Sequence, residues 1–167
     1  SWNEIIRSGV FAGLGEFGDP RSADVLLAWL DRAKPMDARA AAAAGLRSLA
    51  ATRRIDPGEV QTRVVEALIA ALDDPSELAQ RAVLGALAEW NDARAIPALE
   101  RFIAGNPDES PVRTAREAIL KLQKGHTANE EARTLRTDLD ELRQENRTLR
   151  DKLETLEARM NGNTSPH

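Results

Sequence analysis

Apolar residues recur at helical spacing up to about residue 123. Apolar positions lie three and four residues apart, with polar or charged residues between them, as in amphipathic helices. Short segments rich in Gly, Pro, Asn and Asp interrupt this pattern at regular intervals, and such segments mark turns. The pattern predicts helices over 2–17, 22–32, 36–53, 58–73, 76–90, 94–104 and 110–123.

The expected helices are of two alternating kinds. One kind has a face of small residues, which lets a neighbouring helix approach closely. The other kind carries large anchors such as Trp29, Leu68 and Phe102. A hairpin of one helix of each kind would bury a continuous core only when several hairpins stack. The small residues are Gly9, Ala12, Gly13, Ala40–Ala44, Gly45, Ala82, Gly85, Ala86, Ala115 and Ala118.

The chain also repeats itself. The segment Gly9–Arg21 has a counterpart at Ala82–Arg94, in which Phe17 corresponds to Trp90 and Asp19 to Asp92. Self-similarity at a period of tens of residues is typical of stacked-repeat proteins. The sequence therefore predicts an all-α fold, a solenoid of about three and a half helical hairpins over residues 1–124.

This alternation resembles the HEAT repeat over residues 2–123. The likeness rests on the turn residues Asp19 and Asp92, on Pro97 inside a bulky helix, and on an arginine near the start of each small-faced helix. The resemblance implies that arginine and aspartate form ladders between neighbouring repeats, with ligand binding as the alternative. The helix 36–53 and the turn after it depart from the spacing, so the second repeat is irregular. The arginines are Arg7, Arg39, Arg81 and Arg113.

The first expected helix has apolar residues with nothing upstream to cover them. These residues are Trp2, Ile5, Ile6, Val10 and Phe11. A repeat array normally begins with a cap whose outer face is polar. We therefore expect the chain to be the C-terminal part of something longer.

After residue 127 the apolar period changes to seven. Ala128, Leu135, Leu142, Leu149 and Leu156 form one row, and Ala132, Leu139, Asn146, Leu153 and Met160 form the other. A heptad pattern of this length predicts a coiled coil. We expect a hinge at 125–127, with Thr127–Glu130 as a capping box, a parallel coiled coil over 128–160 and a disordered tail over 161–167.

Charged residues beside the two rows indicate a parallel homodimer. In a parallel pair, the residue just before each member of the second row lies opposite the residue five positions later on the partner helix. The four resulting pairs have opposite charges. Asn146 can pair with its own copy only in the aligned register. The alternative is a solvated single helix or a disordered segment. The charge pairs are Glu131–Arg136, Asp138–Arg143, Glu145–Arg150 and Lys152–Glu157.

Composition excludes several classes of function. The 167 residues carry a formal net charge of −4 with mixed signs, which argues against a nucleic-acid partner. Cysteine is absent, and no apolar run is long enough to cross a membrane. We expect a cytoplasmic protein, with export of a longer parent left open.

Catalytic groups are scarce. His126 and His167 are the two histidines, neither has acidic partners at metal-ligand spacing, and no HExxH motif occurs. We therefore expect no catalytic, cofactor-binding or metal-binding residue in this chain.

The opening Ser1–Gly9, continuing into Gly13-Leu14 and Gly18-Asp19, looks like the C-terminal HEAT-like region of bacterial aminopeptidase N zinc metallopeptidases. The resemblance implies a helical region beside an upstream catalytic domain, which binds the zinc, and a role in limiting substrate access. The coiled coil would then dimerise the enzyme. The alternatives are an independent HEAT scaffold that binds a protein partner and, third, a HEAT-like bilin lyase or nucleic-acid-binding relative.

Overall fold

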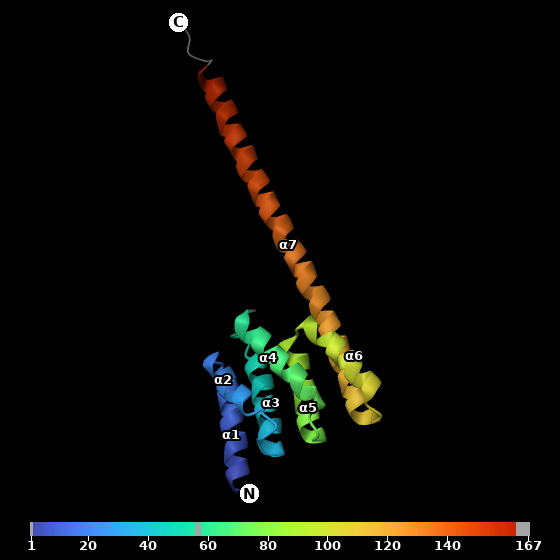
Figure 1. Cartoon of the computed structure of the whole chain (residues 1–167). Helices are drawn as coiled ribbons and strands as arrows, with labels where there is room; N and C mark the ends of the chain where they lie inside the picture. Colours follow the sequence, from blue (N-terminus) through green and yellow to red (C-terminus); the bar gives the residue numbers. More distant parts are fainter. Residues whose placement is uncertain (1, 56–57, 163–167) are drawn as a thin grey trace. The chain divides into compact units, whose positions relative to one another are not determined.

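The computed structural model describes residues 2–55 and 58–162, and Figure 1 shows its elements. All secondary structure in these residues is helical, which confirms the all-α expectation. The chain divides into two compact units, Ser1–His126 and Thr127–His167. The first unit contains the packed hairpins, and the described residues of the second all belong to one helix.

Helices form at each segment where the punctuation predicts one. A short 3₁₀ turn, η1, replaces the end of the fourth expected helix, and a second one, η2, replaces the start of the sixth. The elements are α1 (Trp2–Phe17), α2 (Arg21–Ala28), α3 (Met36–Ala51), α4 (Glu59–Ala70), η1 (Ala71–Asp73), α5 (Glu77–Trp90), η2 (Ala93–Ala95), α6 (Ile96–Gly105) and α7 (Glu109–Gly162).

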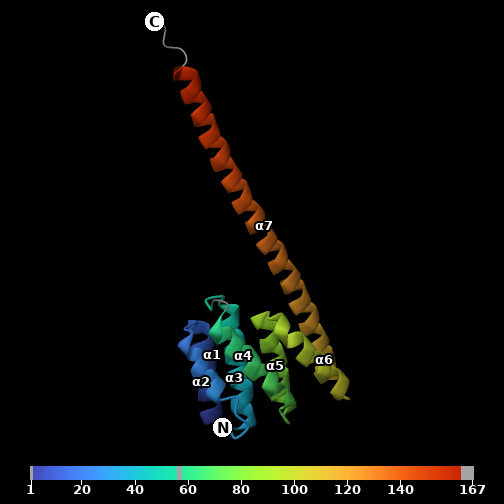
Figure 2. The ribbon, with the colours of Figure 1, turned by 45° about the horizontal axis from the view of Figure 1, so that its top comes forward.

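The small-faced helices α1, α3 and α5 lie side by side in that order (Figures 1 and 2). The close approach of α1 to α3 depends on two glycines. A Cβ atom on Gly15 would overlap the carbonyl oxygen of Gly45, and one on Gly45 would lie 2.7 Å from the carbonyl oxygen of Phe11. The small-residue expectation holds here, but Gly9 and Gly13 take no part, since a Cβ atom on either would contact nothing.

The bulky helices form a second row, in which α2 contacts α4. Their anchors meet the small-faced helices in one core. Leu26, Leu46, Leu68, Leu87 and Leu99 are fully buried in it. The core is therefore aliphatic, and it joins successive hairpins as the repeat pattern predicts.

The turns after α1 and α5 have the same construction. Gly18 and Asn91 both have positive φ, +74° and +52°, which ends each helix in a left-handed residue. Asp19 and Asp92 then accept a hydrogen bond from the amide of the residue two positions later. The repeated sequence motif thus produces a repeated turn.

The helix α7 continues through the expected hinge at 125–127, and the boundary between the two units, His126–Thr127, falls within that segment. The capping box at Thr127 is not used, since no helix begins there. Gly125 has a packing role instead: a Cβ atom would overlap the carboxamide of Asn91. Glycine within a helix costs only about 1 kcal/mol relative to alanine, which the helix-forming neighbours offset.

The second unit is the remainder of α7. It includes the expected coiled-coil segment 128–160, and the helix extends to Gly162. Of the expected disordered tail 161–167, the first two residues are helical, and residues 163–167 lie outside the described residues.

Candidate interaction surfaces

One expected arginine forms a ladder rung. Nε of Arg39, in α3, donates to Oδ2 of Asp74 at 2.6 Å, and Nη2 donates to Oδ1 at 2.8 Å. Both side chains are less than a tenth exposed. The guanidinium hydrogen bonds hold the pKa of Asp74 below its ordinary value, against the opposing effect of burial. Asp74 also accepts from the amide of Ser76 before α5, so the pair joins two consecutive hairpins and is structural.

The corresponding position one hairpin earlier is built differently. Arg7 takes the place of Arg39, and Lys34, which precedes a proline as Asp74 does, takes the place of Asp74. Two cations cannot form a salt bridge. Both cations lie on the ring of Trp29 instead, Arg7 at 5.1 Å and Lys34 at 5.0 Å from its centroid. Cation–π contacts thus replace the rung, an arrangement that the helical pattern alone does not reveal. Phe11 packs on the same ring at 5.5 Å.

The remaining ladder residues act locally or are exposed. Asp19 pairs with Arg21 and Asp92 with Arg94, so both turn aspartates cap their own turn rather than form a rung. Asp92 also accepts from Nε2 of Gln61 at 3.2 Å. Hydrogen bonds from these arginines lower the pKa of both aspartates. Arg81 and Arg113 are exposed, so only Arg39 matches the expected ladder in the described part of the chain.

The apolar residues expected to be uncovered at the start of the chain fall into two groups. Ile5, Ile6 and Val10 are exposed, as expected. Phe11 is 3% exposed, because it points to the core and contacts Trp29. The side chain of Trp2 lies outside the described residues.

An apolar groove of about 590 Å³ lies on the small-faced helices α1 and α3. Four of its nine lining residues are alanines, and the exposed side chains of Ile5 and of the α5 residue Leu78 also line it. Such a groove can receive apolar side chains of a partner. Its lining residues are Ile5, Ser8, Ala12, Asp37, Ala40, Ala41, Ala44, Ser48 and Leu78.

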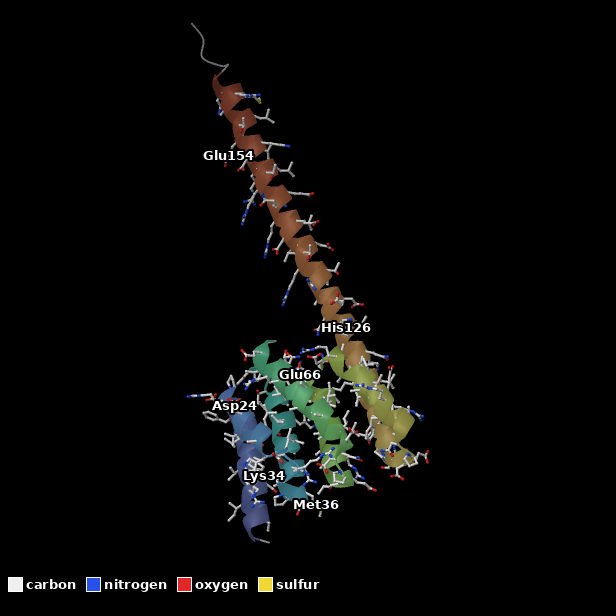
Figure 3. All side chains as sticks on the ribbon, in the orientation of Figure 1. Asp24, Lys34, Met36, Glu66, His126 and Glu154 are labelled. Atoms are coloured by element: carbon white, nitrogen blue, oxygen red, sulfur yellow. The ribbon has the colours of Figure 1, made fainter. Side chains whose placement is uncertain are left out.

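The expected coiled-coil residues all lie on the second unit and all are exposed. This unit is one helix, and its side chains are drawn with those of the first unit in Figure 3, where Glu154 is labelled. We call seven large apolar side chains the seam; their exposed fractions range from 48% to 72%. Heptad spacing puts them on one face. They are Leu135, Leu139, Leu142, Leu149, Leu153, Leu156 and Met160.

The polar members of this face make weak contacts within the helix. Nδ2 of Asn146 donates to the carbonyl oxygen of Leu142 at 3.5 Å, and Arg143 pairs with Asp140 at 3.4 Å. Both contacts are solvent-exposed and contribute little to stability. Asn146 and its flanking charges therefore keep their capacity to pair with a second helix.

No group of three or more His, Cys, Asp and Glu residues that could hold a metal ion occurs in residues 2–55 and 58–162. His126 lies on α7 (Figure 3). No described helix combines the length and apolar character that crossing a membrane requires.

Comparison with known proteins agrees with this geometry. The protein-family model described as HEAT repeats matches residues 48–145, more than half of the chain. The match starts near the end of α3, covers α4–α6 and extends along α7. No curated protein matches the sequence. The stacked hairpins, the buried Arg39–Asp74 pair and this match together show that the chain belongs to the HEAT-repeat family.

Proposed function

We propose that the chain is a non-catalytic scaffold that binds a protein partner on its HEAT repeats and pairs with a second copy through residues 128–160. HEAT repeats are helical scaffolds for protein interaction, which supports the first part. The exposed seam is the observation that carries the second part.

The seam makes a solvated single helix a costly arrangement. Full burial of one leucine side chain stabilises by roughly 1.5 to 3 kcal/mol. The seven seam residues are 48% to 72% exposed. The helix is already formed, so pairing gains this energy with little further loss of backbone entropy. A second helix with the same seam would cover it.

The polar residues select an identical, parallel partner. In parallel register Glu145 meets Arg150 of the second copy, and Lys152 meets Glu157. An antiparallel arrangement sets Arg143 near Arg150, which is repulsive. Asn146 lies in the row where a buried asparagine specifies parallel register by bonding to its own copy. Opposite charges and one polar residue thus favour self-pairing in a single orientation.

Pairing would give the scaffold two partner-binding surfaces. Two linked sites raise avidity without any new contact when both can be engaged at once. The apolar groove on α1 and α3 is one surface where such a partner could bind.

The test compares two lysine substitutions on the same helix. Leu142→Lys puts a charge into the seam, and Gln144→Lys puts the same charge on the outer face. Sedimentation velocity of the full chain at micromolar concentration should show a monomer for Leu142→Lys and a dimer for Gln144→Lys. If both variants sediment like the unmodified chain, the seam is not the pairing surface.

A second candidate is that this scaffold is the C-terminal part of a zinc aminopeptidase, in which it shapes substrate access. The resemblance of Ser1–Gly9 and Gly18-Asp19 supports this candidate, and the exposed Ile5 and Val10 would fit against a preceding domain. The zinc would then be bound upstream, with no ligand from this chain.

The coding sequence immediately upstream of Ser1 separates the two candidates. An HExxH motif followed by a distant glutamate would support the aminopeptidase. An initiator methionine or a polar capping helix would overturn that candidate and leave the independent scaffold.

A further inference from the structure

The repeated motif allows α1 and α5 to be compared position by position. Gly18 and Asn91 occupy the same left-handed turn position, and Asp19 and Asp92 cap the same turn. Residues 73 apart in number therefore have equivalent places on the two helices. Ile6, Val10, Gly13 and Phe17 of α1 correspond to Ala79, Val83, Ala86 and Trp90 of α5.

Burial differs at these four equivalent positions. Ile6, Val10 and Phe17 are 56%, 52% and 69% exposed. Their counterparts Ala79, Val83 and Trp90 are 1%, 1% and 7% exposed. The second helices of the pair agree, because Val25 of α2 is 46% exposed and its counterpart Ala98 of α6 is 7% exposed. We call Ile6, Val10, Gly13, Phe17 and Val25 the α1 stripe.

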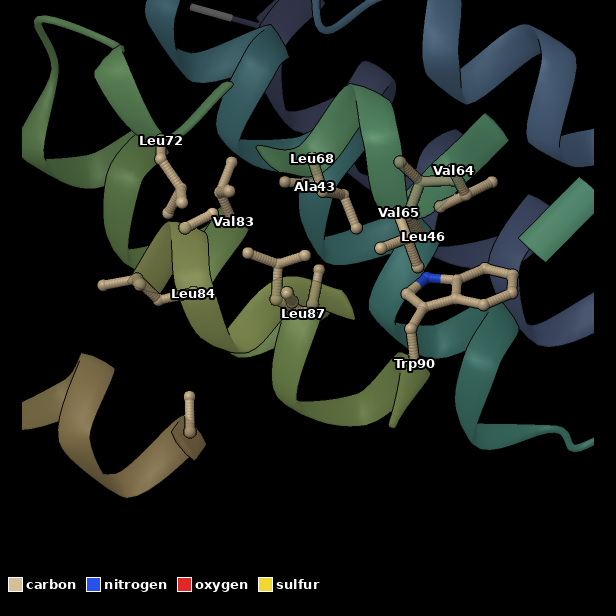
Figure 4. Packing of buried hydrophobic residues seen from close by; sticks show 14 of the residues in the cluster. Ala43, Leu46, Val64, Val65, Leu68, Leu72, Val83, Leu84, Leu87 and Trp90 are labelled. Atoms are coloured by element: carbon tan, nitrogen blue, oxygen red, sulfur yellow. The ribbon is translucent and has the colours of Figure 1, made fainter. Parts of the chain in front are cut away.

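The cover on α5 is the preceding hairpin. Both α3 and α4 pack against α5. Figure 4 shows Val83 and Trp90 among the buried residues Leu46 of α3 and Val65 and Leu68 of α4. In the described residues no hairpin occupies the corresponding place on α1, and its apolar side chains are exposed for that reason.

Charged residues around α5 indicate which charges would suit a hairpin on α1. Arg47 of α3 lies against Gly85, with Nη1 3.4 Å from where a Cβ atom would be. The pKa of Glu89 is lowered, chiefly by a hydrogen bond from Lys121 and also by the charge of Arg47. Their counterparts Ala12 and Glu16 on α1 are both exposed. A hairpin on α1 would therefore be favoured by a basic residue placed as Arg47 is.

We propose that the α1 stripe is the docking surface for a helical hairpin of a partner protein, packed as α3 and α4 pack on α5. This inference rests on the proposed scaffold function and names the chemistry of the partner. The hairpin has an aliphatic face and a basic residue opposite Ala12 and Glu16.

A tethered hairpin serves as the probe for this surface. A second copy of residues 36–75 is fused directly before Asn3 of the full chain, which preserves the 73-residue register because Asn3 corresponds to Ser76. The tether raises the effective concentration of the hairpin to the millimolar range, so that even a low-affinity contact with α1 is populated. Hydrogen exchange of the α1 amides should slow at least tenfold relative to the unextended chain.

Two substitutions in the extended chain control the result. Val10→Asp places a charge in the stripe and should abolish the added protection of α1. Leu120→Asp alters an equally exposed apolar residue of the first unit, outside the stripe, and should leave the protection unchanged. Unchanged exchange on extension, or protection that survives Val10→Asp, would overturn the proposal.

A second copy as the occupant would give a different result. The α1 amides of the unextended chain would then become protected as concentration rises, and Val10→Asp would remove that protection. This outcome also contradicts a partner hairpin. The mass of each sample reports the seam independently, so failure of the stripe and failure of coiled-coil pairing are distinguishable.

Discussion

Leu46 and Leu139 are the same residue type on well-formed helices, in opposite surroundings. Leu46 of α3 is fully buried between neighbouring helices, whereas Leu139 of α7 is 48% exposed. Apart from the exposed α1 stripe, the first unit covers its apolar faces with its own helices. The described part of the second unit belongs to a single helix with an equally regular apolar face, which is exposed in one chain.

The difference shows that a hydrophobic pattern predicts a face but not what covers it. Period 3.6 and period 3.5 both produce an apolar face on a helix. In the first unit, short turns return the chain so that hairpins cover one another. In the second unit no turn follows within the described residues, and the proposed cover is a second copy of the same helix.

Alanine substitutions of Leu46 and Leu139 should have different effects. Leu46→Ala leaves a cavity in the closed core and should lower the free energy of unfolding of the first unit by roughly 3 to 5 kcal/mol. Leu139→Ala should leave that unit unchanged and weaken the dimer. Urea unfolding followed by circular dichroism at two protein concentrations separates these effects. An unchanged coiled-coil transition in Leu139→Ala would favour a solvated single helix.

The next effect concerns the buried rung. Asp74→Ala leaves the Arg39 charge buried without its partner and should destabilise the first unit by about 3 kcal/mol. The control is Asp24→Ala, which breaks the half-exposed Asp24–Arg63 pair and should cost less than about 1 kcal/mol. If thermal unfolding shows equal losses of stability in the two variants, the Arg39–Asp74 pair does not stabilise the packing of the hairpins.

The rung also predicts a direction with pH. The pKa of folded Asp74 lies below its ordinary 3.8, so the unfolded chain binds the proton first as pH falls. The stabilisation is therefore full above about pH 4 and is lost as pH drops through the folded value. In Asp74→Ala this part of the acid dependence should be missing, as acid titration of both proteins would show.

A smaller effect is expected at Asn146, the polar residue among the seam positions. Asn146→Leu should raise the melting temperature of the coiled coil, because a polar residue leaves the interface, and should loosen the fixed oligomeric state. Gln144→Leu on the outer face is the matched control. A uniform parallel dimer in Asn146→Leu, by light scattering, would show that Asn146 does not specify the register.

The smallest effect concerns the flanking charges. Glu145→Lys sets like charges against Arg150 of the second copy and should weaken pairing by roughly 0.5 kcal/mol per contact. Adding Arg150→Glu should restore the affinity, and 1 M salt should remove the difference. Dissociation constants from sedimentation equilibrium test this. Absence of restoration would argue against the parallel charge pairs.

The sequence predicted the helices of the first unit because each turn carries a chemical signal. Gly18, Asn91 and Asp92 end or cap helices through local backbone conformation, which a sequence shows directly. The continuity of α7 through Gly125 was missed, since glycine is read as a break unless its packing against Asn91 is known.

Side-chain partners were harder to predict than helices. The shared arginine position suggested four equivalent rungs, yet Arg39 pairs with Asp74 and Arg7 stacks on Trp29. The residue opposite decides the contact, and it is distant in sequence. For the seam residues, heptad spacing predicted a common face, whereas the proposed burial depends on a second chain that one sequence does not display.

The most direct test of the central claim is the mass of the full chain in solution. Light scattering at micromolar concentration should give twice the 18.3 kDa of one chain. A mass of 18.3 kDa throughout the micromolar range would contradict pairing through the seam, because the seam would then be exposed in a stable monomer.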